Sequence, residues 1–429
     1  MDYNEYVKYL RDCSGRGINL GLERISELME KLGNPQNKTK IIHVAGTNGK
    51  GSFCAMMSTV LTKAGYKTGN FSSPALTGVT DYFRINCRKI SEKAFTDAMN
   101  IVYPVCESMT DKPTEFEILT AVAFVLFERK KCDVAVVECG MGGDTDSTNI
   151  ITAPVLSVIT NVREDHTAIL GNTIEEIATH KAGIIKPDCP VFFGGCSFDI
   201  PDIIEKTARE KNAELFTRDN SKADYYYDCF ISIWNDSGSV FSYRGMKINL
   251  SLIGVHQFEN ALNVLNCIDI LISKGFEIPD SVIQTGLAKV KCQGRFEFIR
   301  KRPTIIFDGS HNPDGVKCLA DTLQSCFRQK KFVFIIGVMA DKDYTCYPDI
   351  LREHMEIVFT VTPDNPRSLD CQTLAGSFSA NGIPACAFHN MKECVKSAYD
   401  YAKEKNLPLI AMGSLYMYKD FINALDKIL

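Results

Sequence analysis

The stretch VAGTNGKGS, residues 44–52, begins at the end of the apolar run KIIHVA (40–45) and decides the fold of the N-terminal half. It joins a predicted strand to a glycine-rich turn and then to FCAMMSTVLTKAG, which has the composition of a helix. Exposed N–H groups of such a turn, together with the positive end of the helix dipole, bind phosphate oxygens. The stretch therefore predicts a phosphate loop between a strand and a helix.

This loop differs from the usual P-loop signature. That signature places a glycine five residues before the Gly of Gly-Lys-Ser/Thr, but Val44 occupies this position, and Gly51 stands between Lys50 and Ser52. Lys50 would neutralise phosphate charge, and the Ser52 hydroxyl would reach Mg²⁺ or a phosphate oxygen. The alternative is an ordinary glycine-rich turn, but the order of strand, loop and helix favours phosphate binding.

The bulk composition favours a soluble enzyme that acts on small anions. The chain has 429 residues, 45% of them hydrophobic, which predicts two domains, with a third as the alternative. Its net charge is -4 with both signs mixed, and no long basic run is present. This pattern argues against nucleic acid or a membrane as the main partner.

The cysteines and the N-terminus indicate a cytoplasmic protein. The 17 cysteines are scattered without a C-x-x-C pair, which indicates neither a zinc framework nor a redox motif. The N-terminal MDYNEYVKYLRDC is acidic and amphipathic, unlike a signal peptide, and no apolar run approaches the roughly 20 residues of a membrane span. We therefore expect free thiols in a reducing compartment.

Short β-branched runs alternate with helical patterns, which indicates parallel sheets covered on both faces. The predicted strands are KIIHVA (40–45), DVAVVE (133–138), VLSVIT (155–160), TIIFD (304–308), FVFIIG (332–337), EIVFTV (356–361) and PLIAMG (408–413). Both halves are therefore predicted to be α/β.

Two further segments organise the chain. Between about 215 and 250, aromatic and β-branched residues alternate with polar ones around NDSG (235–238), which indicates an antiparallel hairpin appended to the first sheet. A charge cluster in residues 287–303 then precedes a new strand. We place the domain boundary there, which gives domains of residues 1–295 and 296–429.

Polar residues follow the predicted strands of the first half. Glu138 ends the run DVAVVE, and Asp165 and His166 follow the next run. Ligands of open parallel sheets bind at the carboxyl ends of strands, so these residues are expected beside one crevice. Mg²⁺ prefers hard oxygen ligands, which makes Glu138 a candidate magnesium ligand. The alternatives are a surface carboxylate that caps a turn and a structural histidine.

Lys181 lies in TIEEIATHKAGIIKP, a predicted helix that places it on one face with Ala178, Ala182 and Ile185. From the residues alone, it is most simply a surface lysine whose apolar stem covers the helix.

The second half repeats the pattern of the first. The strand TIIFD delivers Asp308 to the turn Gly309-Ser310-His311-Asn312-Pro313, and GVMADKD follows the strand FVFIIG. Polar loops at the strand ends of both halves predict a site in the cleft between the domains, completed by closure.

Seven motifs that occur in order resemble the folylpolyglutamate synthase/dihydrofolate synthase family, a branch of the Mur ligases. They are GTNGKGS (46–52), SSP (72–74), VECGMGGDTDSTN (137–149), DH (165–166), HKAGIIK (180–186), GRFE (294–297) and DGSHNP (308–313). The resemblance spans the chain from LGLER (20–24) to GSLY (413–416). It implies an N-terminal P-loop-like parallel-sheet domain with a small antiparallel addition, and a C-terminal Rossmann-like α/β domain.

The resemblance also implies ATP-dependent amide bond formation. ATP phosphorylates a carboxylate to an acyl phosphate, which the amino group of L-glutamate then attacks. The acceptor is a folate or dihydropteroate. Two Mg²⁺ ions are implied, which neutralise charge between ATP and the incoming carboxylate. Members of this branch are commonly monomers, so a monomer is expected.

The site residues carried over from the family fall into four groups. The ATP contacts are Thr47, Asn48, Gly49, Lys50, Gly51, Ser52, Asn260, Arg295 and Asp308, with His311 on the nucleotide side. The metal ligands are Ser73, Glu138 and His166. Lys181 matches a lysine that is carbamylated in the family, which replaces the surface-lysine interpretation. The folate-lining residues are Leu20, Gly21, Leu22, Thr114, Phe116 and Glu117, although Phe116 is equally well a core aromatic of a helix.

One segment departs from the family pattern. Ala75 stands where many members have histidine, and Asp81-Tyr82 where they have Glu-Arg. The segment lies near the pterin-bearing substrate, so the use of dihydropteroate stays open. Two other functions also stay open: a Mur-type ligase for a different acceptor, and an ATP-binding regulator without catalysis. The LGLER segment and the absence of a UDP-binding N-terminal domain count against the first, and intact Glu138, His166 and Lys181 count against the second.

Overall fold

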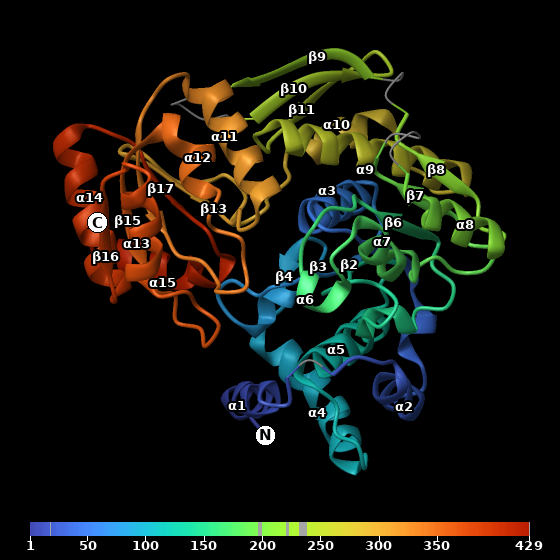
Figure 1. Ribbon diagram of the computed structural model, residues 1–429. Coiled ribbons are helices and arrows are strands. Elements are labelled where there is room, and N and C mark those ends of the chain that lie inside the picture. The colour runs from blue at the N-terminus through green and yellow to red at the C-terminus, as the bar shows by residue number, and fades with distance from the viewer. Residues whose placement is uncertain (18, 196–199, 220–222, 231–237, 429) are drawn as a thin grey trace. The chain divides into compact units, whose positions relative to one another are not determined.

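A computed structural model describes residues 1–429 except 18, 196–199, 220–222, 231–237 and 429 (Figure 1). The chain forms two compact units. The N-terminal unit comprises Met1–Asp224, Tyr243–Met246 and Asn260–Val290, and the C-terminal unit comprises Tyr225–Ser242, Lys247–Glu259 and Lys291–Leu429. The boundary at residues 295 and 296 stays a prediction.

The N-terminal unit is built on an eight-stranded sheet with the order β4-β3-β2-β5-β1-β6-β7-β8. The strands are β1 Lys40–Ala45, β2 Thr68–Phe71, β3 Phe83–Ile85, β4 Arg88–Lys89, β5 Val134–Glu138, β6 Leu156–Ile159, β7 Val191–Phe193 and β8 Leu215–Thr217. Strands β2, β5, β1, β6, β7 and β8 are parallel, whereas β3 and β4 form an antiparallel edge. The predicted parallel sheet is confirmed.

Helices cover both faces of this sheet, and its central strands β5, β1 and β6 are mostly apolar and almost entirely buried. One core contains side chains of α1, α2, α4 and α5, and another contains side chains of α6, α7 and α8. The helices are α1 Tyr3–Ser14, α2 Glu23–Lys31, α3 Lys50–Lys63, α4 Glu92–Ser108, α5 Glu115–Arg129, α6 Thr167–Leu170, α7 Ile174–Ala182, α8 Asp202–Glu210, α9 Val255–Ser273 and α10 Asp280–Leu287.

Three strands form a separate sheet. They are β9 Ala223–Phe230, β10 Gly238–Tyr243 and β11 Met246–Leu250, in the order β11-β10-β9. The prediction that they extend the first sheet is wrong, because their hydrogen bonds define a sheet of their own. Arg244 and Gly245 both have positive φ, which suits a tight turn between β10 and β11. Residues 235–237 of the predicted turn lie outside the described residues.

The C-terminal unit contains a six-stranded sheet with the order β12-β13-β17-β14-β15-β16. All neighbours are parallel except β12, which pairs antiparallel with β13. The strands are β12 Glu297–Lys301, β13 Thr304–Asp308, β14 Phe332–Ile336, β15 Met355–Val361, β16 Ala385–Phe388 and β17 Leu409–Met412. The helices are α11 Pro313–Phe327, α12 Tyr347–Leu351, α13 Cys371–Ala380, α14 Met391–Lys405 and α15 Tyr418–Asp426. The predicted Rossmann-like α/β domain is confirmed.

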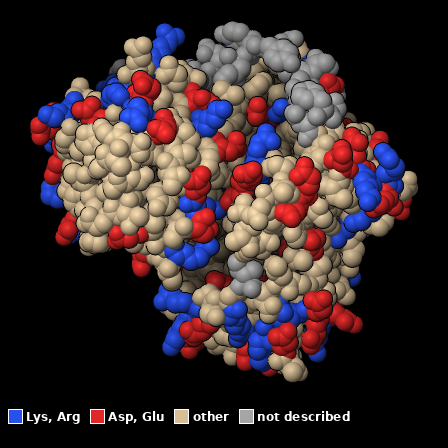
Figure 2. Space-filling model, in the orientation of Figure 1, with Lys and Arg blue, Asp and Glu red and all other residues tan. Residues whose placement is uncertain are grey.

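The charges on the surface and the state of the cysteines can be compared with what the composition indicates. On the face shown in Figure 2, Lys and Arg are interspersed with Asp and Glu. No disulfide joins the cysteines in the described part of the chain. Among the helices of that part, none is both long and apolar enough to cross a membrane.

Candidate active site

The phosphate loop connects β1 to α3 and is fastened to the end of β6. The Asn48 N–H donates to Oδ1 of Asn161 at 2.9 Å, and the Thr160 hydroxyl donates to the Asn48 carbonyl at 2.7 Å. Gly46 has a φ of 144°, and a Cβ at this position would lie 1.9 Å from Oγ1 of Thr160. Glycine is therefore required at residue 46 both by conformation and by space.

Lys50 is the first residue of α3, and its ammonium group closes the loop. Its Nζ donates to the carbonyls of Gly46 at 2.9 Å and Thr47 at 3.1 Å. Gly49, the N-cap residue, has a φ of 84°. A Cβ on Gly49 would lie 2.3 Å from Oδ1 of Asn260, so the Asn260 side chain packs directly on the loop. The structure thus brings Asn260 to the predicted phosphate site.

A small pocket lies against this loop. Its lining includes five residues predicted for the site, which come from three separate stretches of sequence. The lining residues are Gly46, Thr47, Lys50, Gly140, Met141, Gly142, Asp165, His166, Leu170 and Lys181. His166 precedes α6 in a left-handed conformation with a φ of 52°. The carboxyl ends of β1, β5 and β6 therefore converge as predicted.

Lys181 is buried in the wall of this pocket. Its side chain is 2% exposed, which makes the surface-lysine interpretation wrong. Ala178, Ala182 and Ile185, which were predicted to share its helix face, are also buried, although α7 ends at Ala182. Burial, followed by the nearby Lys50 ammonium, lowers the pKa of Lys181 to about 7. A large fraction of this amine is therefore neutral at physiological pH.

Glu138 is the last residue of β5 and lies opposite Val44 of β1. It is 4% exposed, so it is not the surface carboxylate considered as an alternative. A Cβ on Gly51 would lie 3.7 Å from Oε2 of Glu138, which places the carboxylate beside the first turn of α3. Gly51, the residue inserted relative to the P-loop signature, therefore lies next to this carboxylate.

A buried polar network, not predicted from the sequence, supports the segment after Glu138. Nε2 of His43 lies 2.8 Å from Oγ1 of Thr148 and 3.1 Å from Sγ of Cys139. The Thr148 hydroxyl donates to Oδ1 of Asp146 at 2.6 Å, and the Met141 N–H donates to Oδ2 at 2.9 Å. Burial, with a smaller effect of Lys186, lowers the pKa of His43 to about 3, so this histidine stays neutral. Its polar side chain in an otherwise apolar strand was the available sequence signal.

The predicted folate-lining residues divide into structural and accessible groups. Glu117 is buried and forms a capping box with Thr114 at the start of α5. Its Oε2 also lies 3.2 Å from Nε of Arg24, whose guanidinium donates to the Asn19 carbonyl at 2.7 Å. These contacts connect α5 to the segment that carries Leu20, Gly21 and Leu22. Leu20 is 49% exposed.

Phe116 lies close to the pocket. A Cβ on Gly140, a pocket residue, would lie 2.7 Å from the Phe116 ring. The Phe116 ring also packs on Phe71, with a centroid separation of 5.7 Å. Phe116 is only partly buried. This position is compatible with both of the interpretations considered, and a pterin contact stays a prediction.

The segment that departs from the family pattern is organised by Asp81. Its Oδ2 accepts from the N–H of Thr77 at 2.5 Å, from the Thr77 hydroxyl at 2.8 Å and from the N–H groups of Leu76 and Gly78. Lys89 lies 3.2 Å from Oδ1. Burial raises the pKa of Asp81, but the Thr77 bonds and Lys89 outweigh it, so the pKa is lowered overall. The Asp81 carboxylate therefore fixes the loop after Ser73 and Pro74.

We expect Asp81→Asn to destabilise the protein by about 1–3 kcal/mol at neutral pH, because it removes charge-assisted hydrogen bonds. The lowered pKa means that this stability is present above the unfolded pKa of about 4 and is lost as the pH falls. The free energies of unfolding in urea should therefore differ between wild type and variant, and this difference should become smaller below about pH 4. Asp97→Asn, which removes an exposed pair with Lys93, should change little. A difference in the free energy of unfolding that does not vary with pH would contradict the conclusion that the Asp81 carboxylate is charged in these hydrogen bonds.

In the C-terminal unit, the predicted nucleotide residues gather around Asp308. Its Oδ2 accepts from the Phe296 N–H at 2.7 Å, and its Oδ1 accepts from the Ser310 N–H at 2.9 Å. Nδ1 of His311 lies 2.8 Å from the Gly309 carbonyl. His256, which was not predicted, lies near this group: burial lowers its pKa, Asp308 opposes that shift and Arg295 adds to it.

Comparisons with known proteins agree with this geometry. The Mur ligase middle domain matches residues 44–268, and the Mur ligase glutamate ligase domain matches residues 294–415. The dihydrofolate synthase/folylpolyglutamate synthase of Bacillus subtilis (strain 168) is 33% identical over 419 residues, 94% of each chain. The folylpolyglutamate synthase of Mycobacterium tuberculosis, solved with ADP and AMPPCP, has a TM-score of 0.88 at 27% identity, covering 100% of this chain and 99% of its own.

A second solved structure, E. coli FolC in complex with DHPP and ADP, has a TM-score of 0.84 at 28% identity and covers 100% of this chain and 98% of its own. The fold and the matching domains thus define a Mur-type ligase. The chain belongs to the dihydrofolate synthase/folylpolyglutamate synthase family. The resemblance noted from the ordered motifs is confirmed.

Proposed function

We propose that this chain uses ATP to join L-glutamate to a folate through an acyl phosphate. The observation that carries the proposal is the pocket in which Lys50 of the phosphate loop, His166 and the buried Lys181 meet. The named activities of the B. subtilis and M. tuberculosis relatives, and the ADP bound in the solved structures, support it. A cytoplasmic monomer that binds these small molecules is part of the proposal.

The residues of the N-terminal unit have separable roles in this proposal. The N–H groups of residues 49–52 and the Lys50 ammonium bind the triphosphate at the positive end of α3. A carboxylate is a poor electrophile until one oxygen becomes part of a phosphate leaving group, so these groups hold the phosphate to be transferred. Asn260 supports the loop from the side of Gly49. Arg295, Asp308 and His311 are assigned to the nucleotide by the resemblance alone.

The donor set beside the loop fits magnesium. Glu138 supplies a buried carboxylate, and the resemblance adds the Ser73 hydroxyl and the His166 imidazole. Carboxylate and hydroxyl oxygens are hard ligands of the kind that Mg²⁺ prefers. When bound, the ions would neutralise charge between ATP and the substrate carboxylate. Two ions, as in the family, remain a proposal.

Lys181 is proposed to be carbamylated. Its neutral amine would add to the carbon of CO₂ and release a proton, which leaves a carbamate anion in place of an ammonium cation. Lys50 disfavours a cation at residue 181 but would attract an anion there. A carbamate oxygen would also be a suitable ligand for Mg²⁺.

The test is an assay of phosphate release with ATP, Mg²⁺ and glutamate, run in parallel with dihydropteroate and with tetrahydrofolate, with the products identified by mass. Glutamate-dependent phosphate and a product one glutamate heavier are expected with tetrahydrofolate. Product from dihydropteroate as well would establish a bifunctional enzyme. No turnover with either acceptor would contradict the proposal: ATP binding alone would then favour the regulator, and turnover with another acceptor would favour a different Mur-type ligase.

We expect Glu138→Gln to lower kcat by roughly 100-fold or more, because the variant keeps the shape of the side chain but loses the negative charge that would bind the metal. The activity of the variant should also require more Mg²⁺ for half-saturation. Glu128→Gln changes an exposed carboxylate at the end of α5 and serves as the control. An unchanged magnesium requirement in Glu138→Gln would remove Glu138 from the metal site.

A further inference from the structure

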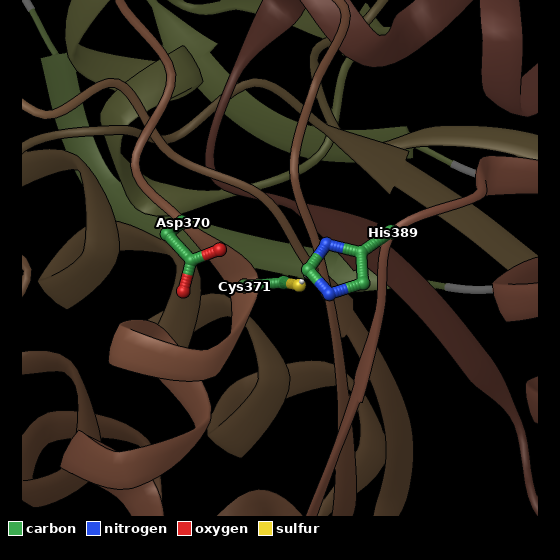
Figure 3. Close-up of side chains that lie close together, drawn as sticks. All are labelled: Asp370, Cys371 and His389. Carbon is green, nitrogen blue, oxygen red and sulfur yellow. Dashed lines mark hydrogen bonds between the residues drawn. The ribbon is translucent and has the colours of Figure 1, made fainter.

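Three metal-ligating side chains meet in the C-terminal unit at residues that the proposed ligase reaction does not use. They are Asp370, Cys371 and His389, and their ligand atoms all lie within 4.8 Å of one another. Figure 3 shows the Cys371 sulfur directed at the imidazole ring of His389, with the Asp370 carboxylate beside them. We propose that this cluster, which we call the Cys371 cluster, binds a divalent transition-metal ion such as Zn²⁺.

The chemistry of the ligands selects the kind of ion. A thiolate and an imidazole are ligands that Zn²⁺ and Co²⁺ prefer, whereas Mg²⁺ and Ca²⁺ prefer oxygen. Two of the three side chains of the Cys371 cluster are of the first kind. The ion would therefore differ from the magnesium proposed for the N-terminal unit.

The distances are close to those of a tetrahedral site. Sγ of Cys371 lies 3.4 Å from Nδ1 of His389. Bond lengths of about 2.3 Å to sulfur and 2.0–2.1 Å to nitrogen at tetrahedral angles separate two such ligands by roughly 3.6 Å. His389 is exposed, so its side chain can rotate to close the remaining distance. Three protein ligands would leave the fourth position to water.

Two elements of the sheet hold the ligands in place. The Thr360 hydroxyl at the end of β15 donates to the Cys371 carbonyl at 2.8 Å, and the Cys371 N–H donates to the Thr362 hydroxyl at 3.0 Å. His389 directly follows β16, whose last residue pairs with the last residue of β15. Cys371 is thus hydrogen-bonded to the end of β15 and His389 directly follows β16, so both ligands have the rigid backbone that a metal site needs.

Asp370 can bind a metal without giving up its structural role. It is the N-cap of α13, and its Oδ2 accepts from the N–H groups of Gln372 at 2.9 Å and Thr373 at 3.1 Å. Both cap bonds go to the same oxygen, so a metal at Oδ1 would leave the cap intact. The ion would then join the start of α13 to the segment between β16 and α14.

The test uses the full chain, stripped of metal with a chelator and kept reduced, with excess Mg²⁺ present to occupy oxygen-ligand sites. Co²⁺ titration should produce the near-ultraviolet thiolate-to-cobalt charge-transfer band at one equivalent, and Zn²⁺ should displace it. Zinc should also raise the melting temperature increasingly with its free concentration. A chain that binds no zinc, or binds cobalt without the thiolate band, would overturn the proposal and show that Cys371 and His389 form only a hydrogen bond.

Matched variants separate the Cys371 cluster from other cysteines. Cys371→Ser and His389→Gln should abolish the cobalt band or weaken zinc binding at least about 10- to 100-fold, the cost of losing even a supporting residue of a metal site. Asp370→Asn keeps the helix cap and should weaken binding less. Cys386→Ser, which removes an exposed cysteine of β16, should bind like wild type. Equal zinc affinity in wild type and Cys371→Ser would also overturn the proposal, whatever the ligase assay shows.

Discussion

Lys50→Ala is expected to lower kcat by at least about 100- to 1,000-fold, the cost of removing one fixed group that stabilises transition-state charge. The ammonium group has two functions here. It donates to the Gly46 and Thr47 carbonyls, which closes the phosphate loop, and it supplies the positive charge at the phosphate site. Both are lost in the variant. Steady-state phosphate release and nucleotide binding should be measured together, because a weakened loop should also raise the dissociation constant for ATP.

Lys63→Ala is the matched control for Lys50→Ala. Lys63 is an exposed lysine at the other end of the same helix, α3, so its removal changes the net charge equally without touching the loop. The control should retain wild-type activity. If the kcat of Lys50→Ala were within a few fold of the kcat of Lys63→Ala, the loop would not bind the transferred phosphate.

Much of the fold could be predicted because its central strands are long, apolar and β-branched. All seven predicted strands are present, and β1 and β13 have the predicted bounds. Strand β2, Thr68–Phe71, was missed because TGNF contains two residues typical of turns. It is nevertheless fully buried beside β5, and the Asn70 amide donates to the Val136 carbonyl at 3.4 Å. Tertiary pairing there outweighs the local preference.

The candidate site could be predicted only where a motif carried it. Glu138 ends a strand, and Lys50 and His166 come after strands, so their convergence was expected from the topology of a parallel sheet. The burial of Lys181 could not be expected, because a helical pattern gives a face but not the element that covers it. The role of Asp81 in fixing its loop and the network around His43 were not predicted, because their contacts join residues that no local pattern relates.

The Cys371 cluster illustrates the same limit. Metal sites are recognised in a sequence by close spacing of their ligands, such as C-x-x-C. In the sequence, the rest of α13 and all of β16 separate Cys371 from His389. The two side chains meet because β15 and β16 end at the same edge of the sheet. Only the folded sheet places these side chains together.

Lys181→Ala is expected to lower kcat by roughly 100-fold or more, because it removes the proposed carbamate from a site that holds negative charge next to Lys50. Short carboxylic acids such as formate or acetate should restore part of the activity, since their oxygens can occupy the space of the missing carbamate. They should not rescue Lys50→Ala. Rescue that saturates with carboxylate concentration would distinguish binding in the pocket from a general salt effect.

The wild-type enzyme provides an independent measurement of the same group. Carbamylation needs the neutral amine, and with a pKa of about 7 the neutral fraction rises as the pH increases from 6 to 8. Enzyme depleted of CO₂ should therefore be inactive, and the same concentration of dissolved CO₂ should reactivate it faster at pH 8 than at pH 6. A carbamate would also appear in the mass of peptides trapped by methylation and in a ¹³C signal from labelled CO₂. Full activity of Lys181→Ala, or activity of the wild type that is indifferent to CO₂, would exclude the carbamate and leave Lys181 as a buried neutral amine.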